Sequence, residues 1–115
     1  MSDREMLEFA AKAAGIHVPT KKDYPWAYID ESGIFRDISC AGDGSRMSRW
    51  NPITDDGDAL RLAVKCKIDV VQFSLLVRAD VAGLPDVREP YNGDPLAATR
   101  RAIVRAAAEI GRQMP

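Results

Sequence analysis

The run from Trp50 to Lys65 constrains the fold more than any other part of the sequence, because it joins a turn, an acid-rich helix start and an amphipathic helix. Pro52 disfavours helical backbone angles at Asn51, so the helix is expected to begin after the proline. Thr54 or Asp55 is placed to cap it, since acids favour the positive end of the helix dipole. The helical spacing of the following apolar residues predicts one buried stripe, made of Ala59, Leu60, Ala63 and Val64.

Helices are also predicted near both ends of the chain. Ser2 and Glu5 form the S-x-x-E pattern of a capping box, and helical spacing of apolar residues predicts a helix over about Asp3–Ala14. Near the other end, Asp94 suits a helix cap and Pro95 suits the first helical position. The buried stripe predicted for this last helix consists of Leu96, Ile103, Val104, Ala107 and Ile110.

Three regions between the helices predict strands. Trp26–Ile29 and Ile34–Ile38 are aromatic or β-branched runs around the turn-like Asp30–Gly33, which predicts a hairpin. Ile68–Val77 is apolar on both faces and is expected to be one central strand. Val87–Glu89 predicts a short edge strand.

These elements predict an α+β fold, with three helices packed on a small, mainly antiparallel sheet like an α/β/α sandwich. A chain of 115 residues is long enough for one domain with its own core, over residues 1–115. Within it, residues 21–49 are expected to form a hairpin and a variable loop region, and residues 50–115 the core that bears the motif. Helices on both faces of the sheet would explain a central strand with two apolar faces.

Composition makes several function classes less favoured. The net charge of -1 provides no global field that would recruit nucleic acid. Cys40 and Cys66 are too few for a disulfide framework or a metal site, and both thiols are expected to be reduced. Asp3 and Glu5 do not fit a signal peptide, and the apolar runs are too short to span a membrane. We therefore expect a cytoplasmic protein without a cofactor.

Two stretches of the chain resemble a known family. The first reads W-N-P-x-T-D-D-G-D-A-L-R-L-A-V-K over Trp50–Lys65, and the second reads A-T-R-R-A-I-V-R-A-A-A-E-I-G over Ala98–Gly111. Both are similar to small uncharacterised phage and prophage proteins, the phage α/β/α ("ABA") sandwich domain family. The resemblance covers the C-terminal part of the chain and not residues 21–48. It implies a sandwich-like fold and an infected or lysogenic bacterial host, and it implies no catalytic residues.

Asp55, Asp56 and Asp58 come closest to a metal site, because hard cations bind clustered carboxylate oxygens. Their spacing lacks the pattern of an EF-hand loop, and capping is the commoner role of acids at a helix start. We interpret them as capping residues, with an ion or a small ligand at this turn as the alternative.

No catalytic set is predicted. His17 is the only histidine, and local spacing places no acid beside it, so a general base is not expected. Cys66 lies between Lys65 and Lys67, but a cysteine at a helix end is more often a small buried apolar residue than a nucleophile.

Arginines indicate a binding surface instead. Three of them fall on one side of the last helix and a fourth is adjacent, and such a stripe can meet phosphates or acidic partner surfaces. The other interpretation is a solvated helix face, on which Arg105 pairs with Glu109 one turn away. If the loop Ala41–Arg49 contributes to the same surface, the predicted contact residues are Arg46, Arg49, Arg100, Arg101, Arg105 and Arg112.

These observations favour a small non-catalytic phage or prophage accessory protein that binds a host protein or protein complex, for example to inhibit a host defence system. Nucleic acid is a less favoured partner, because the net charge does not attract it. The alternative is a small ligand- or metal-binding domain, or an enzyme, with its site at the Asp55–Asp58 helix start. Self-association through the alanine-rich last helix is a third hypothesis.

Overall fold

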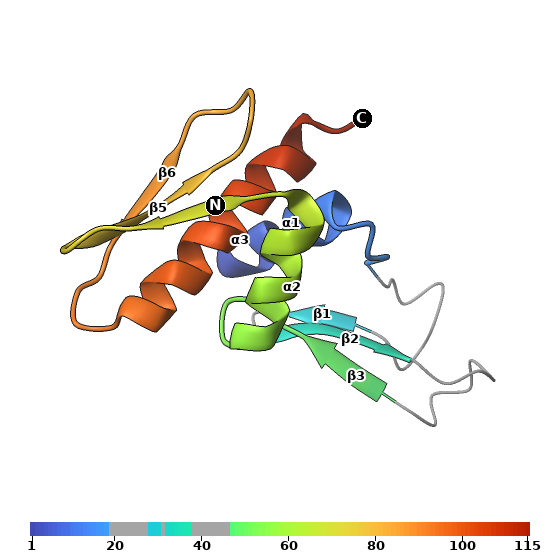
Figure 1. Cartoon of the computed structure of the whole chain (residues 1–115). Coiled ribbons are helices and arrows are strands. Elements are labelled where there is room, and N and C mark those ends of the chain that lie inside the picture. Colours follow the sequence, from blue (N-terminus) through green and yellow to red (C-terminus); the bar gives the residue numbers. More distant parts are fainter. Residues whose placement is uncertain (19–27, 31, 38–46) are drawn as a thin grey trace.

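A computed structural model describes residues 1–18, 28–30, 32–37 and 47–115 of the chain. The helices are α1 (Asp3–Ala13), α2 (Asp56–Cys66) and α3 (Pro95–Gln113). The strands are β1 (Tyr28–Asp30), β2 (Gly33–Asp37), β3 (Met47–Trp50), β4 (Asp69–Gln72), β5 (Leu76–Asp80) and β6 (Val87–Pro90). The predicted α+β class is confirmed (Figure 1).

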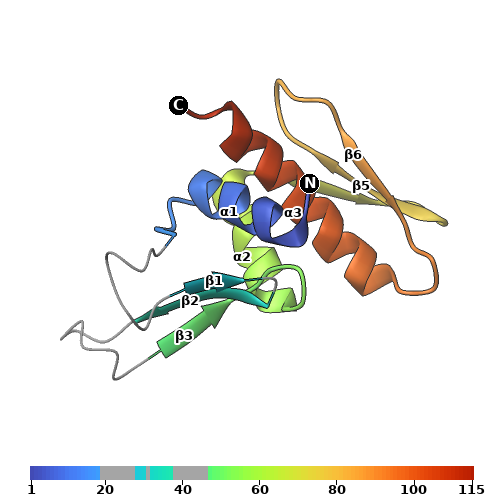
Figure 2. The ribbon, with the colours of Figure 1, turned by 180° about the vertical axis from the view of Figure 1, so that it is seen from behind.

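The strands are divided between two antiparallel sheets, a division that the sequence pattern did not predict. Sheet A has the order β1-β2-β3 and sheet B the order β4-β5-β6. In sheet A, Ile34 pairs with Trp50, and in sheet B, Val70 pairs with Ala79. Helix α3 contacts β5 and β6 on one face of sheet B, while sheet A lies at the other end of the molecule beside α2 (Figures 1 and 2).

The prediction of one central strand over Ile68–Val77 is wrong, because this segment contains a tight hairpin. The chain reverses over residues 74–75, where the Phe73 N–H donates to the Leu76 carbonyl oxygen at 2.8 Å. No glycine, asparagine or aspartate marks the turn, so the apolar pattern runs through it without interruption. The central strand of sheet B is β5, and β4 lies at an edge. The hairpin predicted between β1 and β2 is confirmed.

The helix starts are capped as predicted. The Ser2 hydroxyl accepts the N–H of Glu5 at the start of α1, and Asp55 and Asp94 cap α2 and α3 in the same way. Pro95 occupies the first turn of α3. Each cap satisfies a backbone N–H that has no partner within the helix, which fixes where the helix begins.

The predicted buried stripe of α2 is partly wrong. Ala59 and Ala63 are buried, but Leu60 and Val64 are 65% and 71% exposed, and Leu62 is buried in their place. The apolar residues of α2 therefore cover a wider arc of the helix than the face that packs against α3. In α3, Ile103, Val104 and Ala107 are buried as predicted, whereas Leu96 is exposed in the first turn of the helix.

Helix α3 is the central element, because it contacts α1, α2, β5 and β6. Helices α1 and α2 both pack against it (Figures 1 and 2). Its alanine-rich face is buried inside the chain and is therefore not free to bind a second copy. A Cβ atom added at Gly111 would lie 1.9 Å from the carbonyl oxygen of Phe9, so α1 and α3 meet there almost backbone to backbone.

Sheet A is attached to α2 through a buried asparagine. Asn51 is 2% exposed, and its Nδ2 donates to the Ser32 carbonyl oxygen (2.8 Å) in the turn between β1 and β2. Its Oδ1 accepts the N–H of Ile53 at 3.0 Å, and its own N–H donates to Asp58 Oδ2 at 3.0 Å. We refer to Asn51, Ser32, Ile53 and Asp58 as the Asn51 cluster. It gives the Trp50–Lys65 motif a structural role at the junction of a sheet and a helix.

Candidate functional site

The three acids at the start of α2 all have partners within the chain. Asp55 Oδ2 accepts the N–H of Asp58 at 2.8 Å, and Asp58 Oδ1 lies 2.8 Å from Nη2 of Arg61. Asp56 Oδ1 lies 2.6 Å from Nη1 of Arg100. Among the described residues, no group of three histidine, cysteine, aspartate or glutamate side chains is placed to hold a metal ion. The contacts of these acids are those of capping and ion-pairing residues.

The thiol of Cys66 is not activated. Cys66 is partly buried against the core, and this burial raises the pKa of its thiol more than the charge of Lys65 lowers it. A raised pKa keeps the thiol protonated, and the thiolate is the nucleophilic form. His17 is exposed just after α1, and Cys40 lies outside the described residues.

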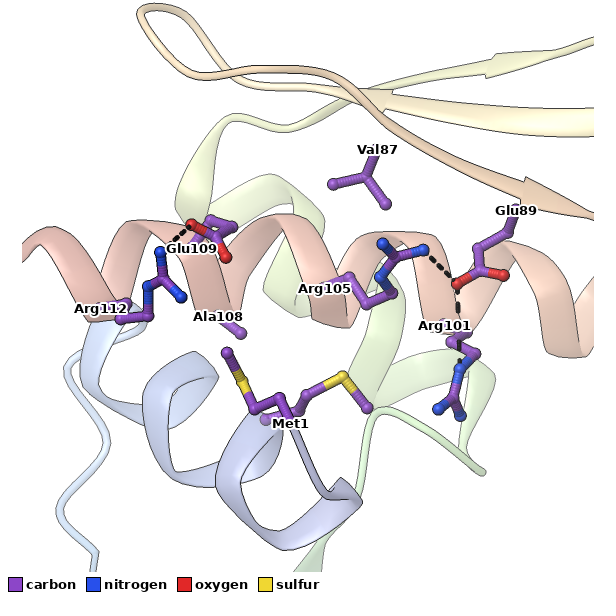
Figure 3. A pocket seen from close by; sticks show the side chains of 9 residues that line it. Met1, Val87, Glu89, Arg101, Arg105, Ala108, Glu109 and Arg112 are labelled. Carbon is purple, nitrogen blue, oxygen red and sulfur yellow. Dashed lines mark hydrogen bonds and ion pairs between the residues drawn. The ribbon is translucent and has the colours of Figure 1, made fainter.

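Three of the predicted arginines line a single cavity of about 420 Å³, which we call the arginine cavity (Figure 3). It lies between α1, β6 and α3. Arg101 and Arg105 are four residues apart along α3, and Arg112 lies seven residues, or about two turns, after Arg105, so all three share one helix face. Glu89 comes from β6, where strand alternation places it on the same face as the buried Val87.

Glu89 organises the charges of this cavity. Its side chain is only 15% exposed, and its Oε1 lies 2.6 Å from Nη1 of Arg105 and 3.9 Å from Nε of Arg101. The pairing of Arg105 with Glu109 that the sequence suggested is therefore replaced, because β6 packs on α3 and brings a closer acid. Glu109 instead faces Arg112, with Oε2 at 3.6 Å from Nη2 (Figure 3).

The three arginines are held with different strength. Arg105 is anchored by the 2.6 Å contact, which has the length of a charge-assisted hydrogen bond. Arg101 lies 3.4 Å from Asp3 and 3.9 Å from Glu89, and Arg112 has its acid at 3.6 Å. Since exposed pairs at such distances contribute little, Arg101 and Arg112 are the guanidinium groups that an incoming anion would meet first.

The remaining wall of the arginine cavity is apolar. Met1 lies across the cavity from Val87 of β6 (Figure 3), and Met6 of α1 and Ala108 of α3 complete the apolar part of the lining. Methionine side chains are flexible and adapt to the shape of what they contact. The cavity has the volume of a ligand site, but five of its nine lining residues are charged, so it is more polar than most small-molecule pockets.

The other predicted contact residues lie elsewhere or have structural partners. Nε of Arg100 donates to the carbonyl oxygen of Ile53 at 2.8 Å, and its Nη1 forms an ion pair with Asp56. Arg100 therefore links α3 to the start of α2. Arg49 is exposed on β3 and lines a separate cavity of about 310 Å³ with Arg61 and other residues. Arg46 and the rest of the loop over residues 41–46 lie outside the described residues.

Sequence reasoning identified the arginine stripe but missed the residues that complete the cavity. Glu89 carried one usable signal, because the predicted edge strand alternates Val87 and Glu89 on one face. No local pattern connects Met1 and Met6 with that strand. Their meeting depends on the packing of α1 against the far end of the chain.

Comparison with known proteins gives no significant match to a family model, to a curated protein or to a solved structure. The phage resemblance of the Trp50–Lys65 motif therefore stays a prediction. In the part of the chain that the structure describes, no helix is both long and apolar enough to cross a membrane.

Proposed function

We propose that the protein is a non-catalytic phage or prophage accessory protein that binds a host protein through the arginine cavity. The observation that supports this is the convergence of Arg101, Arg105 and Arg112 around one open cavity with an apolar wall. The phage resemblance of the motif adds the context of a bacterial host. A host defence complex is the partner class that this context favours.

The chemistry of the cavity indicates which partner segment would fit. Planar guanidinium groups bind carboxylates through paired hydrogen bonds, so Arg101 and Arg112 suit aspartate or glutamate side chains. Met1 and Met6 would contact an apolar side chain next to that acid. We therefore propose an exposed segment of the partner in which an acidic residue neighbours an apolar one.

Capture of partners from a host lysate tests the proposal. The double variant Arg101→Glu/Arg112→Glu reverses the two loosely held charges without touching the buried core, so we expect it to lose the partner that the wild-type chain retains. Arg4→Glu is the matched control, because Arg4 is exposed on α1, pairs with Glu8 and does not line the cavity. Equal retention of the same partner by the wild type and the double variant would remove the arginine cavity from the interface.

A direct binding measurement uses a short peptide of alternating leucine and glutamate residues as the probe. Met6 is buried at the wall of the cavity, so its methyl resonance is expected to shift when the peptide binds. The shift should be absent in the Arg101→Glu/Arg112→Glu variant and present in Arg4→Glu. A Met6 resonance that is unchanged at saturating peptide in the wild-type chain would contradict the proposed chemistry.

A further inference from the structure

Strand β4 leaves one edge of sheet B open. In an antiparallel ladder, hydrogen-bonded residue pairs alternate with pairs that are not hydrogen-bonded. Because the Phe73 N–H donates to the Leu76 carbonyl oxygen, the backbones of Val71 and Arg78 form the next hydrogen-bonded pair. The backbone N–H and C=O groups of Val70 and Gln72 therefore point away from β5. Among the described residues, no hydrogen bond uses those outward groups. An edge of this kind is a template for another strand.

The helix that precedes β4 also has exposed apolar side chains. Leu60 and Val64 lie one turn apart on α2 and are 65% and 71% exposed. Helix α1 and β6 both line the arginine cavity, whereas no residue of α2 or β4 lines it. The open edge of β4 and the exposed apolar side chains of α2 therefore lie outside the arginine cavity, on two elements that follow one another in the chain.

We propose that the open edge of β4 binds a second copy of the chain, with the two β4 strands antiparallel and a two-fold axis at Val71. In this register Val70 of each copy pairs with Gln72 of the other, which uses every outward backbone group of the two residues. The result is one continuous six-stranded sheet, under which Leu60 and Val64 of the two copies come together. The contact is isologous, as two-fold interfaces are.

The side chains in this register are complementary. Val71 faces its own copy across the axis, and Asp69 faces Phe73 of the other chain. The guanidinium group of Arg78 lies 5.3 Å from the centre of the Phe73 ring and pairs with Asp80 of its own chain at 3.0 Å. Asp69 of one copy would therefore approach the Arg78–Asp80 pair of the other, where the guanidinium group has donors for a second carboxylate.

The proposed dimer is independent of the arginine cavity, which lies on the α1 and β6 side. It would leave both cavities open and make the protein bivalent. Two linked sites bind a partner that itself carries repeated copies of the target segment more tightly than one site does.

Sedimentation velocity of the full chain over a concentration series tests the proposal. We expect the wild type to form a dimer reversibly, and Val71→Glu and Val71→Lys each to remain monomeric because like charges meet on the axis. An equimolar mixture of the two variants should dimerise again through a glutamate–lysine pair, which an unfolded variant could not do. A wild-type chain that stays monomeric up to its solubility limit would overturn the proposal, as would a mixture that does not dimerise although each variant retains its circular dichroism spectrum.

Two controls distinguish this edge from other surfaces. Met47→Lys makes the same kind of change on β3, an edge strand of sheet A, and should leave the dimer intact. Leu60→Lys/Val64→Lys should weaken the dimer by roughly tenfold or more, since two exposed apolar side chains per copy lose their contact. Loss of the dimer in Met47→Lys but not in Val71→Glu would place the interface on sheet A. Hydrogen exchange adds a residue-level check, because the amides of Val70 and Gln72 should be protected only in the dimer.

Discussion

Helix α1 and sheet A are attached to the rest of the molecule in different ways. Helix α1 packs on α3 through small residues and direct backbone contact, of which Gly111 against Phe9 is the closest case. Sheet A is joined to α2 through the hydrogen bonds of the Asn51 cluster. At Gly111 the first attachment leaves no room for added side-chain volume. In the second, the hydrogen bonds of buried polar atoms are added to the burial of Ile34 and Trp50 of sheet A in the core.

The difference indicates how each attachment would fail. An added methyl group between close-packed backbones has no space to occupy, so the two helices must separate along their length. A missing polar partner leaves a buried donor or acceptor unsatisfied, but only locally. We therefore expect changes at the helix contact to unfold the whole chain, and changes at the Asn51 cluster to loosen sheet A first.

The largest effect is expected for Gly111→Ala. The added Cβ would collide with the Phe9 carbonyl oxygen, and we expect unfolding in urea to show a loss of about 3 kcal/mol or more. Gly57→Ala is the matched control in α2, because its Cβ would meet only the flexible end of Arg61 and the carboxylate of Asp55. That control should change stability by no more than about 1 kcal/mol and can be stabilising. Similar losses in both variants would show that the close helix contact is not what makes Gly111 necessary.

A smaller effect is expected for Asn51→Ala. The change leaves the Ser32 carbonyl oxygen and the Ile53 N–H without their partner, which costs about 2 kcal/mol. Hydrogen exchange should show faster exchange in β2 and β3 while the amides of α3 keep their protection. Uniform loss of protection in both sheets would mean that the Asn51 cluster supports the whole fold and that the contrast drawn above is wrong.

Arg100→Ala tests how much the contacts of Arg100 between α3 and α2 contribute to the stability of the fold. Arg100 is partly buried and holds both Asp56 and the Ile53 carbonyl oxygen, so we expect a loss of about 1 kcal/mol in thermal unfolding. Arg112→Ala is the matched control on the same helix, since its exposed pair with Glu109 contributes about 0.3 kcal/mol or less. Equal effects of the two changes would contradict the structural role given to Arg100.

The smallest expected effect is the pH dependence of the turn between β1 and β2, to which Asn51 is hydrogen-bonded. Hydrogen bonds from the Ser32 hydroxyl and N–H lower the pKa of Asp30 below its ordinary value. Because the folded pKa is lowered, Asp30 stabilises the turn above its ordinary pKa, and this contribution is lost as the pH falls through the folded pKa. An NMR titration of the Asp30 carboxyl carbon should show the lowered midpoint, and Ser32→Ala should raise it. An unchanged midpoint in Ser32→Ala would assign the lowered pKa to another cause.

Local sequence signals predicted most of the secondary structure. The caps at Ser2, Asp55 and Asp94 each require a specific side chain next to a helix start, and all three are confirmed. The hairpin at residues 74–75 was missed because Ser74 is its only turn-favouring residue, and serine is a weaker turn signal than glycine, asparagine or aspartate. The burial of Leu60 and Val64 was mispredicted because the width of the buried face of α2 depends on how α3 lies against it.

The candidate site was predictable only in part, for a similar reason. The stripe of Arg101, Arg105 and Arg112 follows from helix geometry and was expected. The acid that anchors Arg105 lies on β6, sixteen residues away in the sequence. Helical periodicity finds partners within two turns, so it proposed Glu109 and could not propose Glu89.

The contact between Gly111 and Phe9 joins nearly the first and the last residues of the chain. During synthesis, α1 leaves the ribosome long before its main partner exists, and it must wait until α3 has been released. Folding is therefore completed only after α3 has left the ribosome, and a stop before residue 95 would leave α1 without its main partner.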